Sequence, residues 1–508
     1  MNRTKTRACG VYWGVVALLF GAGAYQRFVS LPSTPFSDPD TWGYLYPALS
    51  GLTKGVFVHT YGRTFVYPLF VYGVLRLFHD FAFISVLQHL LGLGAGAFLL
   101  ASWRMISPPD SVRAWRMALG LVALAVFLLS KTSLLMEHSI RPEAVFPFFA
   151  ILCIWLSLRY GRSRNFFGGA ALVYDAILLY FIKPAWGFGV LFAILPVLVI
   201  EGRVVFKVSV LLVPMFIAYW TLQVPERRLV EKYDPRADRF LPSLLLSVHA
   251  DMIRDEMARD LTAVPATERQ VLEKVIALID AEIRRNAPNS SKLAVNPDVF
   301  LYGKDNVCAL LEDHFKNDIA AYRAFCFSYY KKAWQHQPVK MSRKALRQLY
   351  AFYSWENQGY DASMKAVISD KDTAVRTMNA LKDLPVPCPP YDSYRAASGG
   401  LEKSKGYWRQ FIPVSLLSMI LYGCFPFVIL CGVLVSCFWR NALSYWTLYF
   451  CSYNFGNCLT IAVVHNMQVG RYVKNQLIFT VLSECCALLL IAAAVARGRR
   501  AAPRAPSS

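Results

Sequence analysis

The sequence predicts a mainly α fold, in which a polytopic bundle of about ten membrane helices carries a largely helical soluble insert. Two compositional observations support this, since the 508 residues are 56% hydrophobic and only 17% charged. Soluble domains carry about 25% charged residues on average, which argues against a cytosolic globular enzyme. The third observation is the placement of the acids, because residues 224–408 contain 24 of the 33 Asp and Glu residues.

The apolar stretches have about the length of membrane helices. A bilayer core of about 30 Å needs roughly 20 apolar residues in a helix. Ten stretches meet or approach this length, at about 11–31, 81–103, 115–130, 143–159, 167–183, 185–200, 204–223, 410–438, 444–464 and 475–496. A signal peptide is the alternative for the first stretch, but its apolar run exceeds a typical signal sequence and favours a retained helix.

Lys and Arg residues in short loops predict the orientation, because they accumulate on the cytoplasmic side. They gather at the start of the chain, in alternate loops and in the tail. Both termini are therefore expected in the cytoplasm, with the first long loop, 32–80, and the acidic insert on the opposite side. The expected location is the bacterial inner membrane, with a periplasmic insert.

Four parts follow from this topology. We expect an N-terminal membrane module at 1–223, with about seven helices, and a soluble insert at 224–408. A second module of about three helices, 409–496, and a cytoplasmic tail, 497–508, complete the chain. The insert is expected to be helical, because its residues 267–285 repeat apolar side chains at helical spacing.

The net charge of +21 does not indicate a nucleic-acid partner, because most of the excess marks the cytoplasmic loops and not one water-exposed face. Metal motifs are also missing from the sequence, which contains neither a CxxC pair nor an HExxH motif. No metal ligands are therefore assigned.

The first long loop contains the most informative residues. Asp38 and Asp40 precede an amphipathic stretch at 42–49, and a second one follows at 64–77. Such segments lie naturally in the membrane interface, which would hold both carboxylates where lipid headgroups react. The alternative is that Asp38 and Asp40 only cap the following helix, as Asp often does. Acids are scarce outside the insert, and Arg63 follows on the same loop, which favours a functional site.

These residues also carry a resemblance. The runs Asp40-Thr41-Trp42-Gly43-Tyr44-Leu45 and Tyr61-Gly62-Arg63-Thr64-Phe65-Val66-Tyr67-Pro68-Leu69 resemble the first-loop pattern of the GT-C glycosyltransferase superfamily. Protein O-mannosyltransferases and the aminoarabinose transferases of lipid A are its best-known members. This sequence has Asp-Thr where the mannosyltransferases have Asp-Glu.

The resemblance implies transfer of a sugar from a polyprenyl-phosphate donor to a lipid, glycan or protein acceptor on the periplasmic side. Asp40 would be the general base of an inverting transfer, with Asp38 as the second catalytic candidate. No cofactor is required, although a divalent cation near Asp40 is compatible with the residues. The lipid phosphate is a good leaving group that needs only cations to hold its charge.

The resemblance also points to further site residues. Arg63, Lys183 and Arg471 would bind the donor phosphate, and snorkelling to lipid headgroups is the alternative for Lys183. The residues expected to orient the substrates are Tyr44, His138, Glu143 and His465.

Two other functions stay open. A transporter or flippase of lipid-linked saccharides would also need many helices, but the sequence has no repeat of helices. An O-antigen polymerase or ligase also has a large periplasmic loop, but its site would centre on Arg and His residues of that loop. We assign the insert to acceptor recognition as a working hypothesis.

Overall fold

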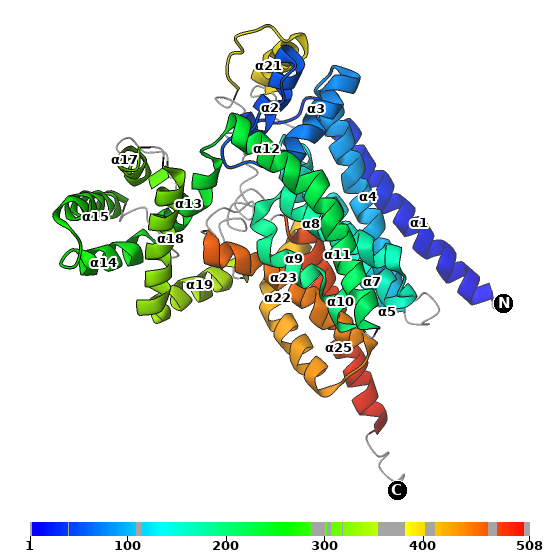
Figure 1. The fold of residues 1–508 in the computed structure, drawn as a ribbon. Helices are drawn as coiled ribbons and strands as arrows, with labels where there is room; N and C mark the ends of the chain where they lie inside the picture. The colour runs from blue at the N-terminus through cyan, green and yellow to red at the C-terminus, as the bar shows by residue number, and fades with distance from the viewer. Residues whose placement is uncertain are drawn as a thin grey trace.

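The computed structural model is built almost entirely of helices (Figure 1). It describes residues 3–38, 40–107, 114–200, 202–286, 300–301, 306–316, 318–353, 381–401, 412–465 and 475–501. Over these residues the only extended pairing is an isolated parallel bridge between Phe36 and Ser139. The predicted mainly α class is therefore confirmed.

All ten predicted apolar stretches are helical. They form α1 (Arg3–Tyr25), α4 (Ala82–Ile106), α5 (Ala114–Leu129), α7 (Phe146–Ser163), α8 (Phe166–Ile182), α9 (Gly187–Ala193) with α10 (Leu195–Val199), α11 (Val204–Ala218), α22 (Ile412–Phe438), α23 (Ala442–Val464) and α25 (Leu477–Ala501). The sixth stretch breaks into two short helices at Ile194, because Pro196 has no amide hydrogen to continue the first one. Helices α4, α7, α8 and α11 pack in sequence, and α22, α23 and α25 pack together.

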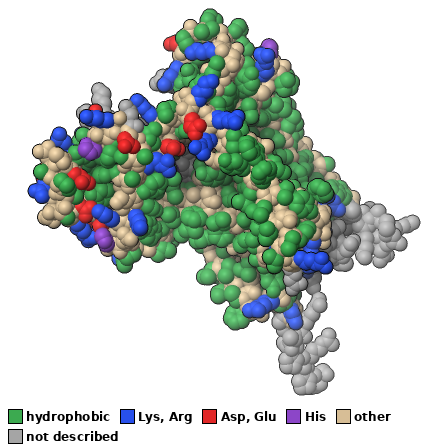
Figure 2. Space-filling view, in the orientation of Figure 1, with side chains coloured by type: hydrophobic (Ala, Val, Ile, Leu, Met, Phe, Trp, Pro, Cys, Tyr) green, Lys and Arg blue, Asp and Glu red, His purple; other side chains and the backbone are tan. Residues whose placement is uncertain are grey.

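Within the described ranges, three helices are long and apolar enough to cross a membrane: Ala82–Ile106, Val204–Tyr233 and Leu477–Arg497. Figure 2 shows hydrophobic side chains spread over the bundle, whereas charged side chains gather on the insert and near α2 and α21. Exposed apolar side chains on α11 include Val205 and Phe216, which would be unfavourable in water. These features indicate an integral membrane protein, while the number of crossings and their direction stay predictions.

The expected boundary between the first module and the insert lies inside a continuous helical run. Helix α11 continues through a π-helical turn, Tyr219–Gln223, into α12 (Val224–Tyr233). The insert therefore begins as an extension of a membrane helix, which fixes its first residues relative to the bundle.

The first loop forms two helices, as its amphipathic pattern predicts. Helix α2 (Thr41–Lys54) ends at Gly55, whose φ of +67° is accessible mainly to glycine. It packs against α3 (Val66–Phe78), and Leu45 and Val71 are completely buried. This pairing holds the start of α2, where Asp38 and Asp40 lie, against the bundle.

The insert has an apolar core of its own. Its helices are α13 (Phe240–Val248), α14 (Ala250–Asp260), α15 (Ala266–Asn286), α17 (Val307–His314), α18 (Ile319–His336), α19 (Pro338–Tyr353) and α21 (Pro389–Leu401). Ile253, Val275 and Tyr322 are fully buried in that core. The helix predicted at 267–285 is confirmed as α15.

The proline-rich run at 383–392 is partly helical. Its second half begins α21, where Pro389 starts the helix because the first helical residue needs no amide hydrogen. Helix α21 lies beside α2 (Figure 1), and the Tyr394 hydroxyl donates to the Pro35 carbonyl at 3.1 Å. The chain thus covers the start of α2 before it returns to the membrane helices.

Candidate active site around Asp40 and Arg63

Asp38 and Asp40 differ in what their carboxylates do. Asp38 Oδ1 accepts hydrogen bonds from the backbone N–H groups of Asp40 at 2.8 Å and Thr41 at 3.1 Å. The Asp40 side chain makes no capping hydrogen bond, and its Oδ1 lies 2.7 Å from Nη2 of Arg63. Asp38 therefore caps the start of α2, as the alternative interpretation expects, whereas the Asp40 carboxylate has no capping role.

Arg63 is held over the first turn of α2. Its guanidinium lies 4.8 Å from the centre of the Tyr44 ring, in a cation–π contact. Gly43 leaves room for it, because a Cβ at that position would lie 3.2 Å from Arg63 Nε. Arg63 Nε is buried and has no hydrogen-bond partner within the described part of the chain. The guanidinium can therefore donate one further hydrogen bond without breaking an existing one.

A second arginine reaches the same loop. Arg141 forms an ion pair with Asp38, and its Nε is also buried without a partner among the described residues. Phe36 aligns the two segments, because it accepts from the Ile140 N–H at 3.0 Å and donates to the His138 carbonyl at 2.9 Å. The resemblance assigns no role to Arg141, so its contact with Asp38 was not predicted.

Lys183 and Glu143 form a buried pair beside these residues. Lys183 Nζ lies 3.4 Å from Glu143 Oε1, and both side chains are less than 10% exposed. Each group can therefore balance the charge of the other in this buried position.

The loop that carries Arg63 is attached to the residues next to Lys183. The Thr64 hydroxyl donates to the Phe181 carbonyl at the end of α8. Six charged residues thus form what we call the Asp40 cluster: Asp38, Asp40, Arg63, Arg141, Glu143 and Lys183. Its residues come from the first loop, from the segment between α6 (Lys131–Glu137) and α7, and from the end of α8, which are distant in the sequence.

His138 does not join the Asp40 cluster. It belongs to a second group, which we call the Glu137 cluster: Arg27, His89, Glu137 and His138. Arg27 Nε and Nη2 each donate to Glu137 at 2.7 Å, and both side chains are at most 3% exposed. Its Nη1 also donates to the Leu128 carbonyl at 2.8 Å.

Histidines extend the Glu137 cluster toward Thr34. His89 Nδ1 lies 3.2 Å from Glu137 Oε2, and its Nε2 lies 3.0 Å from His138 Nδ1. His138 Nε2 donates to the Thr34 carbonyl at 2.8 Å. Burial lowers the pKa of His138 to about 3, so the ring is neutral and holds the backbone. His138 and Glu143, which were both predicted to orient the substrates, therefore belong to two different clusters.

The other predicted site residues lie outside the Asp40 cluster or outside the described residues. His465 follows α23, and its carbonyl accepts from Lys344 Nζ at 3.0 Å. Arg471 falls outside the described residues. Within the described ranges, no group of three His, Cys, Asp or Glu side chains is arranged to hold a metal ion. A divalent cation near Asp40 stays a prediction.

A histidine that the sequence did not single out fastens the first loop to α12. The His59 side chain is 2% exposed and lies between two carboxylates. Its Nε2 is 3.2 Å from Glu226 Oε1, and its Nδ1 is 3.2 Å from Asp234 Oδ2. Burial alone would lower the pKa of His59, but the two acids raise it to about 9.

Glu226 also binds the loop backbone, because its Oε2 accepts from the Phe65 N–H at 2.9 Å. Arg63 lies between His59 and Phe65 in the sequence, so these contacts fix the segment that presents it. No short-range pattern could reveal them, because Glu226 lies 167 residues after His59.

The chain was compared with known proteins. No protein-family model and no curated protein sequence matches it. Its structure is similar to the crystal structure of ArnT from Cupriavidus metallidurans bound to undecaprenyl phosphate, with 12% sequence identity and a TM-score of 0.35. The match covers 93% of this chain and 77% of that chain. What this chain does is inferred below from the residues around Asp40.

Proposed function

We propose that this protein is a membrane glycosyltransferase that moves a sugar from a polyprenyl-phosphate donor to an acceptor on the periplasmic side. The observation that carries the proposal is the Asp40 carboxylate, which makes no capping bond and lies 2.7 Å from Arg63. The first-loop motif in which both residues lie supports the same activity.

Asp40 has the chemistry and the exposure of a general base. Its side chain is 27% exposed, and Arg63 beside it is 19% exposed, so both are accessible to a substrate. In an inverting transfer the carboxylate takes the proton of the acceptor hydroxyl while that oxygen attacks the anomeric carbon. The bond from the sugar to the phosphate oxygen breaks, and the polyprenyl phosphate leaves with one additional negative charge.

The cations of the Asp40 cluster suit that leaving group. Arg63 and Arg141 each have a buried Nε without a hydrogen-bond partner among the described residues. A phosphate oxygen would satisfy these donors, and the planar guanidinium binds phosphate through two parallel hydrogen bonds. Lys183 is adjacent, and its ammonium group would add to the positive potential there. Cations that already lie in place stabilise the developing charge without reorganisation.

Donor binding and activation of the base are then coupled, because Arg63 exchanges Asp40 for the donor phosphate as its partner. In this structure Arg63 donates to Asp40 Oδ1, one of the two carboxylate oxygens that could accept the proton. When Arg63 turns to the donor phosphate, this oxygen becomes available to the acceptor hydroxyl. Donor binding would therefore increase the capacity of Asp40 to act as the base.

The experiment is a turnover assay with purified, reconstituted protein and a panel of polyprenyl-phosphate sugars. Asp40→Asn should reduce donor consumption about 10²- to 10⁴-fold, the usual contribution of a positioned base. Asp80→Asn is the matched control, because Asp80 is an exposed acid that only caps α4 through the Ala82 N–H. Full activity of Asp40→Asn in a working assay would refute the proposal.

A transporter or flippase of lipid-linked saccharides is the second candidate. Asp175 on α8 and Glu484 on α25 are buried, and each has one carboxylate oxygen without a hydrogen-bond partner within the described ranges. Buried acids in membrane helices can conduct protons. In that case Asp175→Asn and Glu484→Gln would stop the movement of labelled lipid-linked sugar across vesicles, and Asp40→Asn would not.

A further inference from the structure

Helix α19 has one face against the membrane helices and one face that contacts no other element among the residues that the structure describes. Its inner face buries Met341, Lys344 and Phe352. The helix packs against α22 and α23, the first two helices of the C-terminal module. It therefore lies at the junction between the insert and the membrane bundle.

Two contacts show how far α19 extends along the bundle. Lys344 Nζ donates to the carbonyl of Ala462 at 3.1 Å, near the C-terminal end of α23. The Tyr353 hydroxyl donates to Asn454 Oδ1 at 2.5 Å, and its ring stacks on Phe425 of α22 at 4.9 Å. Asn454 and Ala462 are separated by about 12 Å along α23, at 1.5 Å per residue. Helix α19 thus runs beside α23 from its C-terminal end to its middle, and its last residue reaches the middle of α22.

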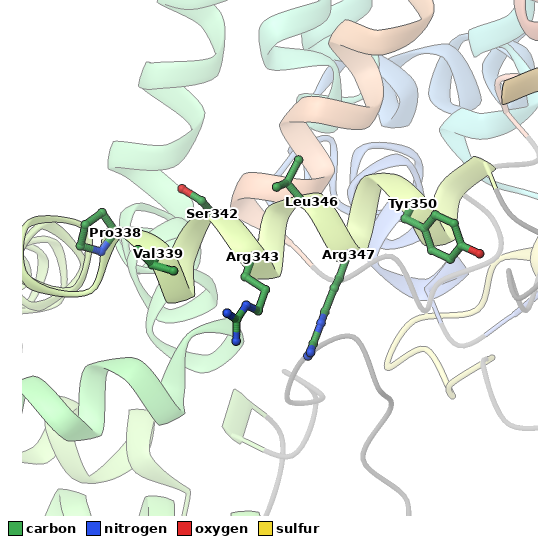
Figure 3. A pocket seen from close by; sticks show the side chains of 7 residues that line it. All are labelled: Pro338, Val339, Ser342, Arg343, Leu346, Arg347 and Tyr350. Atoms are coloured by element: carbon green, nitrogen blue, oxygen red, sulfur yellow. The ribbon is translucent and has the colours of Figure 1, made fainter. Parts of the chain in front are cut away.

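The outer face of α19 combines exposed apolar residues with arginines (Figure 3). Val339, Leu346 and Tyr350 are 68%, 64% and 67% exposed. Arg343 and Arg347 lie on the same face, and a groove of about 590 Å³ runs along these side chains. Within the described part of the chain, neither arginine forms an ion pair, whereas the neighbouring Lys340 is paired with Asp255 at 3.0 Å.

This combination is typical of a helix face that contacts lipid headgroups and the adjoining acyl chains. Arginines on such a helix attract the negative charge of lipid headgroups, and its apolar residues enter the acyl region. Arginine binds a phosphate through two parallel hydrogen bonds. A protein partner would more commonly meet an apolar centre surrounded by charges of both signs, whereas here both charges are positive.

We propose that the outer face of α19 binds an anionic phospholipid of the leaflet next to the insert. Arg343 and Arg347 would hold the lipid phosphate, and Leu346 and Tyr350 would contact its acyl chains. This lipid is a ligand of the surface and not a substrate of the Asp40 cluster, so the inference does not depend on the proposed transferase activity. Its role would be to fix the insert against the membrane.

Native mass spectrometry of the full-length protein tests the proposal, with phosphatidylglycerol and phosphatidylcholine as probes. Arg343→Gln with Arg347→Gln should weaken binding of one phosphatidylglycerol about 10- to 30-fold, at about 1 kcal/mol for each arginine near a charged surface. Binding of phosphatidylcholine should not change. Arg269→Gln with Arg284→Gln, two exposed arginines of α15, is the matched control and should leave the phosphatidylglycerol count intact.

A second measurement covers the case in which the double variant fails to fold. Hydroxyl-radical footprinting of the wild-type protein should show Tyr350 protected in phosphatidylglycerol nanodiscs compared with detergent, while Phe327 on α18 stays equally reactive. An unchanged phosphatidylglycerol count in the folded double variant would overturn the proposal. A change in particle mass without loss of lipid would also overturn it, because the face would then bind a second copy of the chain.

Discussion

The Asp40 cluster and the Glu137 cluster both combine carboxylates with basic side chains, but they differ in exposure. In the Glu137 cluster the Arg27 and Glu137 side chains are 0% and 3% exposed, and Arg27 satisfies its donors with Glu137 and two carbonyls. In the Asp40 cluster, Arg63 and Asp40 are 19% and 27% exposed, and Arg63 retains a donor without a partner among the described residues.

The difference teaches how to separate structural charges from functional ones. A buried ion pair whose donors are all satisfied has no capacity for a ligand, and it is expensive to break. A partly exposed pair with a spare donor can exchange its partner for a substrate. Arg27 is thus excluded as a phosphate ligand, because its donors are all engaged within the Glu137 cluster.

The largest effect on stability should come from the Glu137 cluster. Glu137→Gln leaves the buried Arg27 guanidinium without its counter-charge, and we expect a loss of about 3–5 kcal/mol in the free energy of unfolding. Thermal unfolding in detergent measures it. The control is Glu231→Gln, which removes an exposed pair with Arg227 and should cost less than about 0.5 kcal/mol. Equal effects of both variants would show that burial does not determine how much stability is lost when an ion pair is broken.

The next effect concerns donor binding by the Asp40 cluster. Arg63→Lys keeps the charge but removes the planar guanidinium, so the KM for the donor should rise about 10- to 100-fold. Steady-state kinetics measure it, and the free energy of unfolding should change little. Arg76→Lys on α3 is the control, because Arg76 is exposed in the last turn of its helix. An unchanged KM in Arg63→Lys would remove Arg63 from the donor site.

A smaller effect depends on pH and concerns the attachment of the first loop to α12. The pKa of His59 is about 9 in the folded protein, above its ordinary value of 6.5. The stabilisation is therefore complete below pH 6.5 and is lost as the pH rises through about 9. His59→Gln should cost about 2 kcal/mol at pH 6 and almost nothing above pH 9.

Unfolding of His59→Gln and wild-type protein at pH 6, 7.5 and 9.5 measures this difference. Glu226 and Asp234 face the ring, and Tyr180 lies near Glu226. The loss in the free energy of unfolding caused by His59→Gln should become steadily smaller as the pH rises. A cost that is the same at all three values would mean that His59 acts through its shape and not its charge.

Much of the fold could be predicted from the sequence, because membrane helices are long, apolar and locally encoded. The ten apolar stretches and the two amphipathic stretches of the first loop are helical. The break at Ile194 was not predicted, since the apolar pattern continues through it and only Pro196 marks it. In the proline-rich run at 383–392, prolines are typical of turns, but Pro389 begins α21, because the first helical residue needs no amide hydrogen.

The candidate site could be predicted only where a local motif contains it. Asp40, Arg63 and Tyr44 lie in one loop, and the sequence placed them together. Arg141 and His59 were not assigned, because their partners lie on other segments and a tertiary ion pair leaves no periodic signal. The sequence also could not show which of Asp38 and Asp40 caps α2, since this depends on the direction of each carboxylate.

The exchange of Arg63 between Asp40 and the donor phosphate is tested most directly by the affinity for polyprenyl phosphate. Asp40→Asn frees Arg63 from its carboxylate, so the folded variant should bind polyprenyl phosphate about tenfold more tightly than wild type, since a tenfold change corresponds to 1.4 kcal/mol. The gain should disappear when Arg63→Gln is added, whereas Asp80→Asn should bind like wild type. An affinity that is unchanged or weaker in Asp40→Asn would contradict the exchange.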